Sequence, residues 1–232
     1  MIKGIIFDYG GTLDTDGVHW ANVLFENYQL HGIKISKELF GQAYVYGERA
    51  LAIQPLVKPE HNFLDVLRLK ITQQFLFLQE NGTVLNDVLI EKIAVSCNDF
   101  AKAKVSETIP MLERLADRFP IVMVSNFYGN LPGVLETFGI RKYFKNIVES
   151  AVVGVRKPDA AIYQLGVDAI GLPAAECLVV GDSYSKDIVP ASAVGCQTVW
   201  INGTDWNDSP QNIPSIASYE IKSITELEEI IK

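Results

Sequence analysis

Short apolar runs recur in the second half of the chain and alternate with helical patterns. The runs predict buried strands at residues 121–124, 146–149, 178–180 and 198–201, after an earlier strand at Ile5-Ile6-Phe7. Helical spacing of apolar residues predicts helices at 109–119, 132–138, 160–170, 186–194 and 224–231. Strands that alternate with helices of this length favour right-handed βαβ units and a mostly parallel sheet. Residues 202–218, rich in Asn, Asp, Ser, Gly and Pro, are expected to form a surface loop.

Residues 17–103 carry a different pattern, in which apolar positions recur at helical spacing and no strand is indicated. One stripe is Phe63-Val66-Leu67-Lys70-Ile71, and two others lie at 23–28 and 88–93. Ser36 and Asn62 are suitable N-caps, and Asn81-Gly82 is expected to end a long helix. This pattern predicts four or five helices inserted into an α/β fold. The predicted domains are therefore an α/β core, residues 1–16 and 104–232, and an all-α helical domain, residues 17–103.

Composition narrows the class of protein. The 232 residues are 48% hydrophobic and 21% charged, which is ordinary for a globular protein of one large or two modest domains. The net charge of −8 and the pI near 4.9 argue against nucleic acid or an anionic membrane as a partner. The three cysteines lie in apolar surroundings without the spacing of a zinc site, so we expect small core residues in a reducing compartment.

No targeting or membrane segment is expected. The first apolar run begins at Ile2 and leaves no room for the charged and apolar regions of a signal peptide. No apolar stretch approaches about 20 residues, the length of a spanning helix. These features predict a cytoplasmic protein.

Polar residues that could take part in catalysis or bind a ligand lie at the ends of the predicted strands and at one helix start. They are Asp8 in a sharp turn through Gly10 and Gly11, Ser125-Asn126, Lys157 just before Pro158, and the pair Asp182 and Asp187. The carboxyl ends of parallel strands meet at one edge of a sheet, where open α/β folds place their reactive groups. We therefore expect these side chains to lie close together.

Each of these residues also has an ordinary structural interpretation. Asp8 could cap the next helix or turn, Ser125 could be a turn residue, Lys157 could be solvated, and Asp187 could be the N-cap of the following helix. Together, however, they supply a carboxylate nucleophile, an oxyanion donor, a fixed cation and two metal-binding carboxylates. That set of groups is what phosphoryl transfer on Mg²⁺ requires.

In their order and spacing, four segments resemble the motifs of the haloacid dehalogenase (HAD) superfamily, most of whose members are phosphatases. The segments are DYGGTL at 8–13, VSN at 124–126, RKPD at 156–159 and GDSYSKDI at 181–188. The resemblance implies a HAD-like Rossmannoid core with a helical cap inserted after the first motif. The predicted helices of residues 17–103 lie at that place. In the family, the cap closes over the nucleophile and selects the substrate.

The resemblance also implies roles for single residues. Asp8 attacks phosphorus and forms an aspartyl phosphate, and Asp8, the Gly10 carbonyl and Asp182 hold Mg²⁺. Asp187 is either a direct or an indirect ligand of the metal, or it orients Lys157. The catalytic residues implied are Asp8, Ser125 and Lys157. Contacts to phosphate are implied for Thr12, Ser125, Asn126 and Lys157.

Gly10 departs from the family's pattern, because its phosphatases usually carry a second aspartate two residues after the nucleophile. That aspartate protonates the leaving oxygen and later activates water, a contribution of about 100- to 10,000-fold in rate. A positive φ would be one reason for a glycine at this position. Asp14, Asp16 and His19 follow the turn and are expected to be solvated hinge residues, with proton transfer by one of them as the alternative.

Three functions remain open at this stage. The first is a Mg²⁺-dependent phosphatase of a small phosphorylated metabolite whose leaving group, or own proton donor, offsets Gly10. The second is a dehalogenase, which uses Asp8 without a metal or an acid, and the third is a phosphate-binding or regulatory protein with lapsed catalysis. A phosphonate hydrolase would need a cap lysine, which residues 17–33 lack. Three cap cations, Arg49, Lys58 and Arg68, are assigned no site.

Overall fold

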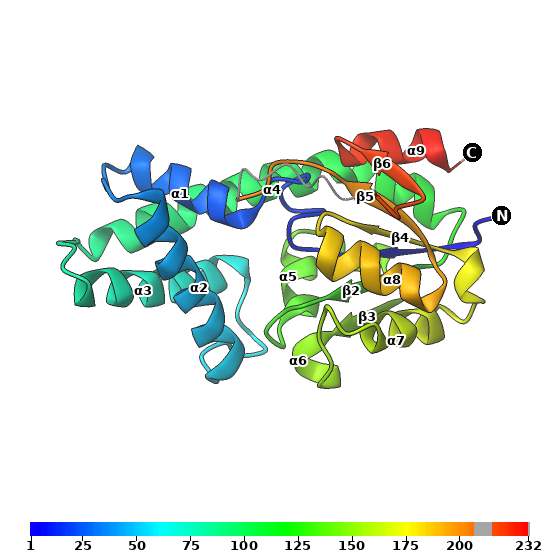
Figure 1. Ribbon diagram of the computed structural model, residues 1–232, viewed down its shortest axis with the longest axis horizontal. Helices are drawn as coiled ribbons and strands as arrows, with labels where there is room; N and C mark the ends of the chain where they lie inside the picture. The colour runs from blue at the N-terminus through cyan, green and yellow to red at the C-terminus, as the bar shows by residue number, and fades with distance from the viewer. Residues whose placement is uncertain (207–214, 232) are drawn as a thin grey trace.

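A six-stranded sheet lies at the centre of the α/β part of the chain, and every neighbouring pair of strands is parallel (Figure 1). The computed structural model describes residues 1–206 and 215–231. In their order across the sheet, the strands are β3 (Asn146–Glu149), β2 (Ile121–Ser125), β1 (Gly4–Phe7), β4 (Cys177–Gly181), β5 (Gln197–Ile201) and β6 (Tyr219–Ile221). The predicted α/β fold is confirmed, and β6 is a strand that the sequence analysis did not identify.

The register of the sheet brings three strand ends together. Phe7 of β1 lies opposite Met123 of β2 and Val180 of β4. Every residue of β1, β2 and β4 is buried, as expected of apolar strands covered on both faces. The polar residues that follow these strands, beginning with Asp8 and Asp182, therefore meet at one edge of the sheet.

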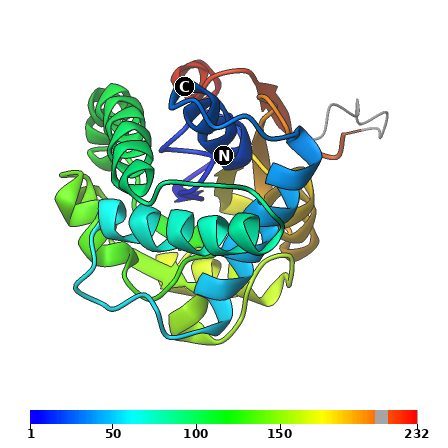
Figure 2. The same ribbon diagram turned by 90° about the vertical axis from the view of Figure 1, so that its left-hand side faces the viewer.

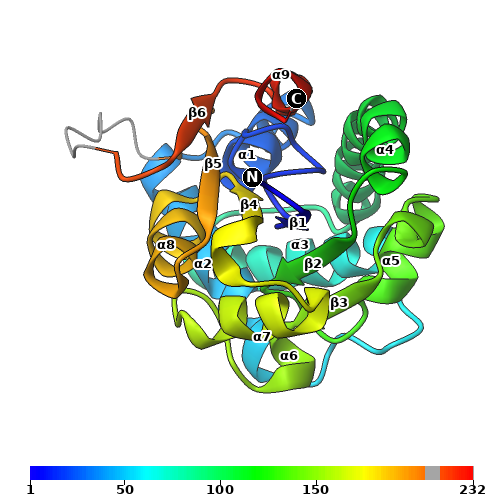
Figure 3. The ribbon, with the colours of Figure 1, turned by 90° about the vertical axis from the view of Figure 1, so that its right-hand side faces the viewer.

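Helices cover both faces of the sheet (Figure 3). On one face, α7 (Ala161–Ile170) and α8 (Val189–Val194) pack against inward residues that include Ile6 and Val179. The other face packs against α5 (Leu131–Thr137), α9 (Leu227–Ile230) and the second half of a long helix, α4. Short helical turns complete this part: α6 (Ser150–Val153), η1 (Arg141–Tyr143), η2 (Ala174–Glu176) and η4 (Ile224–Glu226).

Four helices form a separate group beside the sheet (Figures 1 and 2). They are α1 (Trp20–Leu30), α2 (Lys37–Ile53), α3 (Phe63–Glu80) and the first half of α4 (Val88–Ala116). The side chain of Ser36 accepts a hydrogen bond from the Leu39 N–H (3.1 Å), and that of Asn62 accepts one from the Asp65 N–H (3.0 Å). Both predicted N-caps are therefore confirmed, and four helices agree with the expected number.

Helix α4 joins the helical group to the sheet without a break. Its 29 residues pass through residue 104, where the sequence analysis divides the chain, and include Pro110. The prediction of an independent helix at 109–119 is wrong, because Pro110 lies inside α4 and does not start a new helix. The second half of α4 ends at Ala116 and packs on the sheet through Met111, Leu112 and Leu115.

Two other expectations are modified by the structure. The helix predicted at 186–194 begins with a π-helical turn, η3 (Tyr184–Ile188), before α8 starts. Of the loop predicted at 202–218, residues 207–214 lie outside the described residues. Among the helices of the described chain, none has the length and apolar character needed to cross a membrane.

Candidate active site

Asp8 leaves the sheet at the carboxyl end of β1, in a turn that brings it close to Asp182. Gly11 in this turn has a φ of 96°, and a Cβ there would collide with the Asp182 carboxylate. Glycine alone permits this conformation and this close approach. Gly10 differs, since its φ is not positive and a Cβ there would meet nothing within 4 Å. The backbone therefore does not explain the glycine at position 10.

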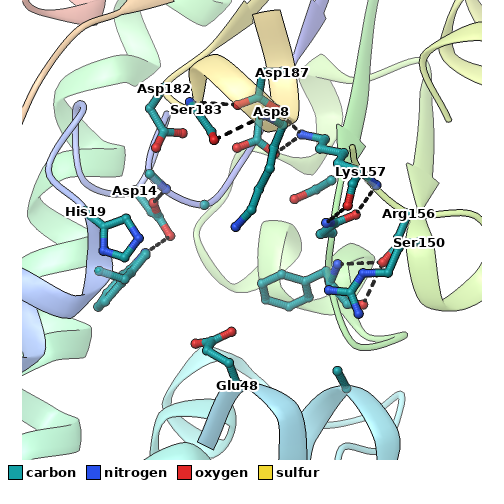
Figure 4. Close-up of a pocket in the computed structure, with 18 of the residues that line it drawn as sticks. Asp8, Asp14, His19, Glu48, Ser150, Arg156, Lys157, Asp182, Ser183 and Asp187 are labelled. Atoms are coloured by element: carbon teal, nitrogen blue, oxygen red, sulfur yellow. Dashed lines mark hydrogen bonds and ion pairs between the residues drawn. The ribbon is translucent and has the colours of Figure 1, made fainter. Parts of the chain in front are cut away.

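Lys157 forms buried ion pairs with two carboxylates (Figure 4). Its Nζ lies 2.6 Å from Asp8 Oδ1 and 2.7 Å from Asp187 Oδ1. None of the three side chains is more than 8% exposed. Charge-assisted hydrogen bonds of this length in a buried site hold their groups in fixed positions.

Neighbouring side chains fix Lys157 and Asp187. The Asn126 side chain donates to the Lys157 carbonyl (3.1 Å), and the Lys157 N–H donates to Asn126 Oδ1 (2.9 Å). The Tyr163 hydroxyl donates to Asp187 Oδ1 (2.7 Å), and the Ser183 N–H donates to Asp187 Oδ2 (2.9 Å). The Asp187 carboxylate thus accepts hydrogen bonds from three donors and orients Lys157, and it caps no helix.

Asp182 completes a cluster of three carboxylates, with Asp8 between Asp182 and Lys157 in Figure 4. Oxygen atoms of Asp8, Asp182 and Asp187 all lie within 4.8 Å of one another. Within the described part of the chain, no lysine or arginine forms an ion pair with Asp182. When ionised, three carboxylates and one ammonium leave two negative charges, with Asp8 and Asp187 buried and Asp182 half-buried. Oxygen donors with this charge suit a hard divalent cation.

Burial controls the protonation of this cluster. Burial raises the pKa of Asp8, and the attraction of Lys157 offsets only part of that effect. Burial also raises the pKa of Asp182 well above its usual value, and the charges of Asp187 and Asp8 add to it. Burial lowers the pKa of Lys157, but attraction to Asp187 and Asp8 outweighs burial, so its pKa is raised. The ammonium stays charged, while Asp8 and Asp182 need additional positive charge to remain ionised.

A cavity of about 1490 Å³ opens in front of the carboxylates, between the sheet and the helical group (Figure 4). The predicted site residues that line it are Asp8, Gly10, Ser125, Asn126, Lys157, Asp182 and Asp187. Ser125 is 2% exposed and ends β2. The edge of the sheet therefore supplies one wall of the cavity, and the helical group supplies the opposite wall.

The opposite wall carries an ion pair between a buried lysine and a half-buried glutamate. Lys70 Nζ of α3 lies 2.6 Å from Glu48 Oε1 of α2. The hydroxyl of Tyr128, in the loop after β2, donates to Glu48 Oε2 (2.8 Å). Burial raises the pKa of Glu48, but Lys70 lowers it further, so the net pKa lies below the usual value. The Glu48 carboxylate therefore links the helical group to the α/β part.

Thr12 and Asn126 hold other residues of the site in place through hydrogen bonds. Thr12 is fully buried and is not among the residues that line the cavity. Its hydroxyl donates to Asp182 Oδ1 (2.9 Å) and accepts from the Asp182 N–H (3.2 Å). Thr12 positions the Asp182 carboxylate in this structure, and the Asn126 side chain positions the Lys157 backbone. Their contacts to phosphate stay predictions.

Asp14 and His19 line the cavity and are not the solvated hinge residues expected from the sequence. Asp14 is 1% exposed. Its Oδ1 accepts a hydrogen bond from the Gly11 N–H (2.7 Å), and its Oδ2 accepts one from Trp20 Nε1 (2.9 Å). Asp16 also has fixed partners, because its carboxylate accepts hydrogen bonds from the start of η4. These contacts tie the hinge to defined places in the fold.

The cations of the helical group are distributed differently from the expectation. Arg49 lines the cavity, whereas Arg68 pairs with Asp65 and Glu91 away from it. Lys58 does not line the cavity either. Lys70 lines the cavity as well, and it occupies an apolar position of the stripe at 63–71. A charged residue in an apolar stripe was the signal that the sequence analysis overlooked.

Comparisons with known proteins agree on one family. A family model described as a haloacid dehalogenase-like hydrolase matches residues 2–195. The chain is similar to pyrimidine 5'-nucleotidase YjjG of Escherichia coli, with 29% identity over 149 residues, which are 63% of each chain. It is also similar to a glyceraldehyde 3-phosphate phosphatase of Methanocaldococcus jannaschii, with 34% identity over 94 residues, 40% of each chain. These matches span less than two thirds of either relative.

A solved structure shows the same fold over the whole chain. It is the putative HAD-hydrolase YfnB of Bacillus subtilis, bound to magnesium, with a TM-score of 0.62. The two proteins share 20% sequence identity, and the match covers 100% of this chain and 99% of the other. At this identity the likeness establishes the fold alone.

Proposed function

Because the chain belongs to the haloacid dehalogenase-like hydrolases, we propose that it is a Mg²⁺-dependent phosphomonoester hydrolase of a small phosphorylated metabolite. The relatives named as a nucleotidase and a phosphatase support this substrate class. The observation that carries the proposal is the cluster of buried Asp8, half-buried Asp182 and buried Asp187 around Lys157, with its uncompensated negative charge.

Asp8 is the proposed nucleophile. Its carboxylate lies at the cavity wall, and attack on phosphorus would form an aspartyl phosphate as the ester oxygen leaves. A phosphate dianion that approaches a carboxylate is repelled by it. Lys157, 2.6 Å from Asp8, offsets that repulsion, and its fixed position means that no reorganisation is needed during the reaction. Ser125, at the same edge, is the proposed donor to a phosphate oxygen.

Asp8, Asp182 and the Gly10 carbonyl are the proposed ligands of Mg²⁺. Asp182 fits this role best, since it is half-buried at the cavity and forms no ion pair with a lysine or arginine among the described residues. Asp187 is less available, because three donors already occupy its oxygens. When bound, the ion would neutralise negative charge on the phosphoryl oxygens. The cytoplasm, where Mg²⁺ and phosphorylated metabolites are available, is the proposed location.

Residues 17–103 are the proposed cap domain, and residues 1–16 and 104–232 the proposed core. The helices of this segment form one wall of the cavity, opposite the nucleophile. A wall of this kind excludes water from the reacting groups and contacts the organic part of the substrate. The polar residues Tyr44, Glu48 and Lys70 on this wall are the proposed contacts of that part.

A screen of aryl, acyl and alkyl phosphates, with Mg²⁺ and with EDTA, tests the proposal. We expect release of inorganic phosphate that requires Mg²⁺ and is abolished in Asp8→Asn. The matched control is Asp168→Asn, an exposed aspartate on α7, which should retain full turnover. Full turnover in EDTA would contradict the proposal. Halide release from 2-haloacids without metal would instead support the dehalogenase alternative.

A further inference from the structure

The site has an empty place where the family's second aspartate would lie. Gly10 lines the cavity, and a Cβ built there would meet nothing within 4 Å. The leaving oxygen of an alkyl phosphate must nevertheless receive a proton as it departs. A group elsewhere on the cavity wall therefore has to supply that proton if the enzyme hydrolyses such esters.

Asp14 lies on this wall, in the same turn as Gly10 and four residues after it. Its carboxyl group is buried and held by two N–H donors, Gly11 at 2.7 Å and Trp20 at 2.9 Å. Each carboxyl oxygen has a second lone pair, so these bonds leave room for a proton. Burial raises the pKa of Asp14 to about 7, although the two donors act in the opposite direction. A group with this pKa gives and takes a proton near neutral pH.

The other acidic residues that line the cavity either belong to ion-paired clusters or are exposed to solvent. Asp8, Asp182 and Asp187 form the charge cluster around Lys157, as described above. Glu48 is paired with Lys70 at 2.6 Å, which keeps it ionised. Asp205 and Glu220 also line the cavity, but both are exposed to solvent.

His19, the neighbour of Asp14 in Figure 4, is not suited to the task. Its Nδ1 accepts a hydrogen bond from the Ala21 N–H (3.1 Å), which caps α1. Burial lowers its pKa below the usual value, so the ring is neutral near pH 7. A neutral imidazole is a poor proton donor. Among the acids that line the described part of the cavity, Asp14 is therefore the remaining candidate for the proton donor.

From these observations we infer that Asp14 is the general acid and base of this enzyme, in place of the aspartate missing at position 10. This inference rests on the proposed phosphatase function. In the first step, the bond from Asp8 to phosphorus forms, the bond from phosphorus to the ester oxygen breaks, and the Asp14 proton passes to that oxygen. In the second step, water attacks phosphorus, its proton passes to Asp14, and the bond to Asp8 breaks.

The test compares two esters in the variant Asp14→Asn. The probes are p-nitrophenyl phosphate, whose leaving group needs no proton, and glycerol 3-phosphate, whose leaving group does. We expect kcat/KM for glycerol 3-phosphate to fall about 100-fold or more, and that for p-nitrophenyl phosphate by less than about tenfold. The matched control is Asp16→Asn, in the same segment but outside the cavity lining, which should preserve the ratio of the two rates.

A second variant keeps the test decisive if Asp14→Asn alters the fold. Gly10→Asp adds a carboxylate where a side chain meets no neighbour, so the double variant Gly10→Asp/Asp14→Asn should recover about tenfold or more of the lost turnover of glycerol 3-phosphate. Melting curves of both variants report folding separately. Equal losses on the two esters, or unchanged turnover of glycerol 3-phosphate in Asp14→Asn, would overturn the role assigned to Asp14 but leave the proposed function standing. Failure of the wild-type enzyme to hydrolyse either ester with Mg²⁺ would overturn the proposed function and this inference with it.

Discussion

The partly buried ion pair of Lys70 and Glu48 offers a quantitative test of how the helical group is joined to the sheet. Lys70→Met keeps the aliphatic stem and removes the charge, and Glu48→Gln keeps the shape and removes the other charge. Lys70→Met leaves the Glu48 carboxylate with the Tyr128 hydroxyl as its hydrogen-bond partner. Glu48→Gln leaves the Lys70 ammonium, the less exposed of the two groups, without its carboxylate partner. We expect Glu48→Gln to be destabilised at least as much as Lys70→Met, since an unpaired charge is costlier the more it is buried.

The expected coupling energy follows from the geometry. A hydrogen bond to a charged group contributes about 1.5–3 kcal/mol when buried, and an exposed ion pair about 0.2–1 kcal/mol. The Lys70 side chain is 10% exposed and that of Glu48 is 33% exposed, at an N···O distance of 2.6 Å. The pair lies between the two cases, so a double-mutant cycle should give a coupling of about 1–2 kcal/mol in the free energy of unfolding.

The dependence on pH has a defined sign. The pKa of Glu48 is lowered in the folded protein, because Lys70 outweighs the effect of burial. Its stabilisation is therefore fully present above the unfolded pKa of about 4.3 and is lost as the pH falls through the still lower folded value. The coupling should be the same at pH 6 and pH 8 and should decrease only in acid.

Urea unfolding followed by circular dichroism, for the wild type and the three variants, measures the cycle. Lys104 and Glu107 provide the control pair, since they lie 3.0 Å apart on the surface of α4 and should couple by less than about 0.5 kcal/mol. A coupling for Lys70 and Glu48 no larger than that of the control would refute this account of the cavity wall.

Three further predictions concern the edge of the sheet. Asp8→Asn should fold normally and still bind the substrate, as isothermal titration would show, but its turnover should fall to the background rate. Steady turnover beyond what trace deamidation of the variant explains would identify another nucleophile. Mg²⁺ at about 100 times its Kd should stabilise the wild type by about 2.7 kcal/mol, and Asp182→Asn should lose most of this gain in a melting experiment. Gly10→Ala should raise the unfolding free energy by about 0.4–1 kcal/mol, whereas Gly11→Ala should lower it, because Gly11 has a positive φ and a Cβ there would collide with the Asp182 carboxylate. Equal effects of the two substitutions would contradict the described turn.

The sheet could be predicted because its central strands are apolar on both faces. β1, β2 and β4 are wholly buried, and such strands appear in the sequence as continuous apolar runs. β6 escaped prediction because its three residues include exposed Tyr219 and Glu220, which leave no apolar run. The sequence analysis divided the chain within α4, but the structure holds Pro110 inside one continuous helix, where tertiary packing outweighs the local preference of proline for a helix start.

For the site too, some features could be predicted from local sequence patterns, and others depend on contacts between residues far apart in the chain. Asp8 and Asp182 could be placed together because both follow adjacent parallel strands. The role of Thr12 depends on a contact 170 positions away, and Tyr163 reaches Asp187 from the face of a helix. No spacing in the sequence encodes those contacts, because they arise only when the layers pack.

Helix α4 has a consequence for how the protein unfolds. At a rise of about 1.5 Å per residue, its 29 residues form a rod of about 43 Å. Cys97, in its first half, packs within the helical group, and Leu112, in its second half, packs on the sheet. One part cannot melt without exposing half of a helix that the other part still holds in place. We expect the helical group and the sheet to unfold in one cooperative transition, with equal calorimetric and van't Hoff enthalpies, despite their separate appearance in Figure 1.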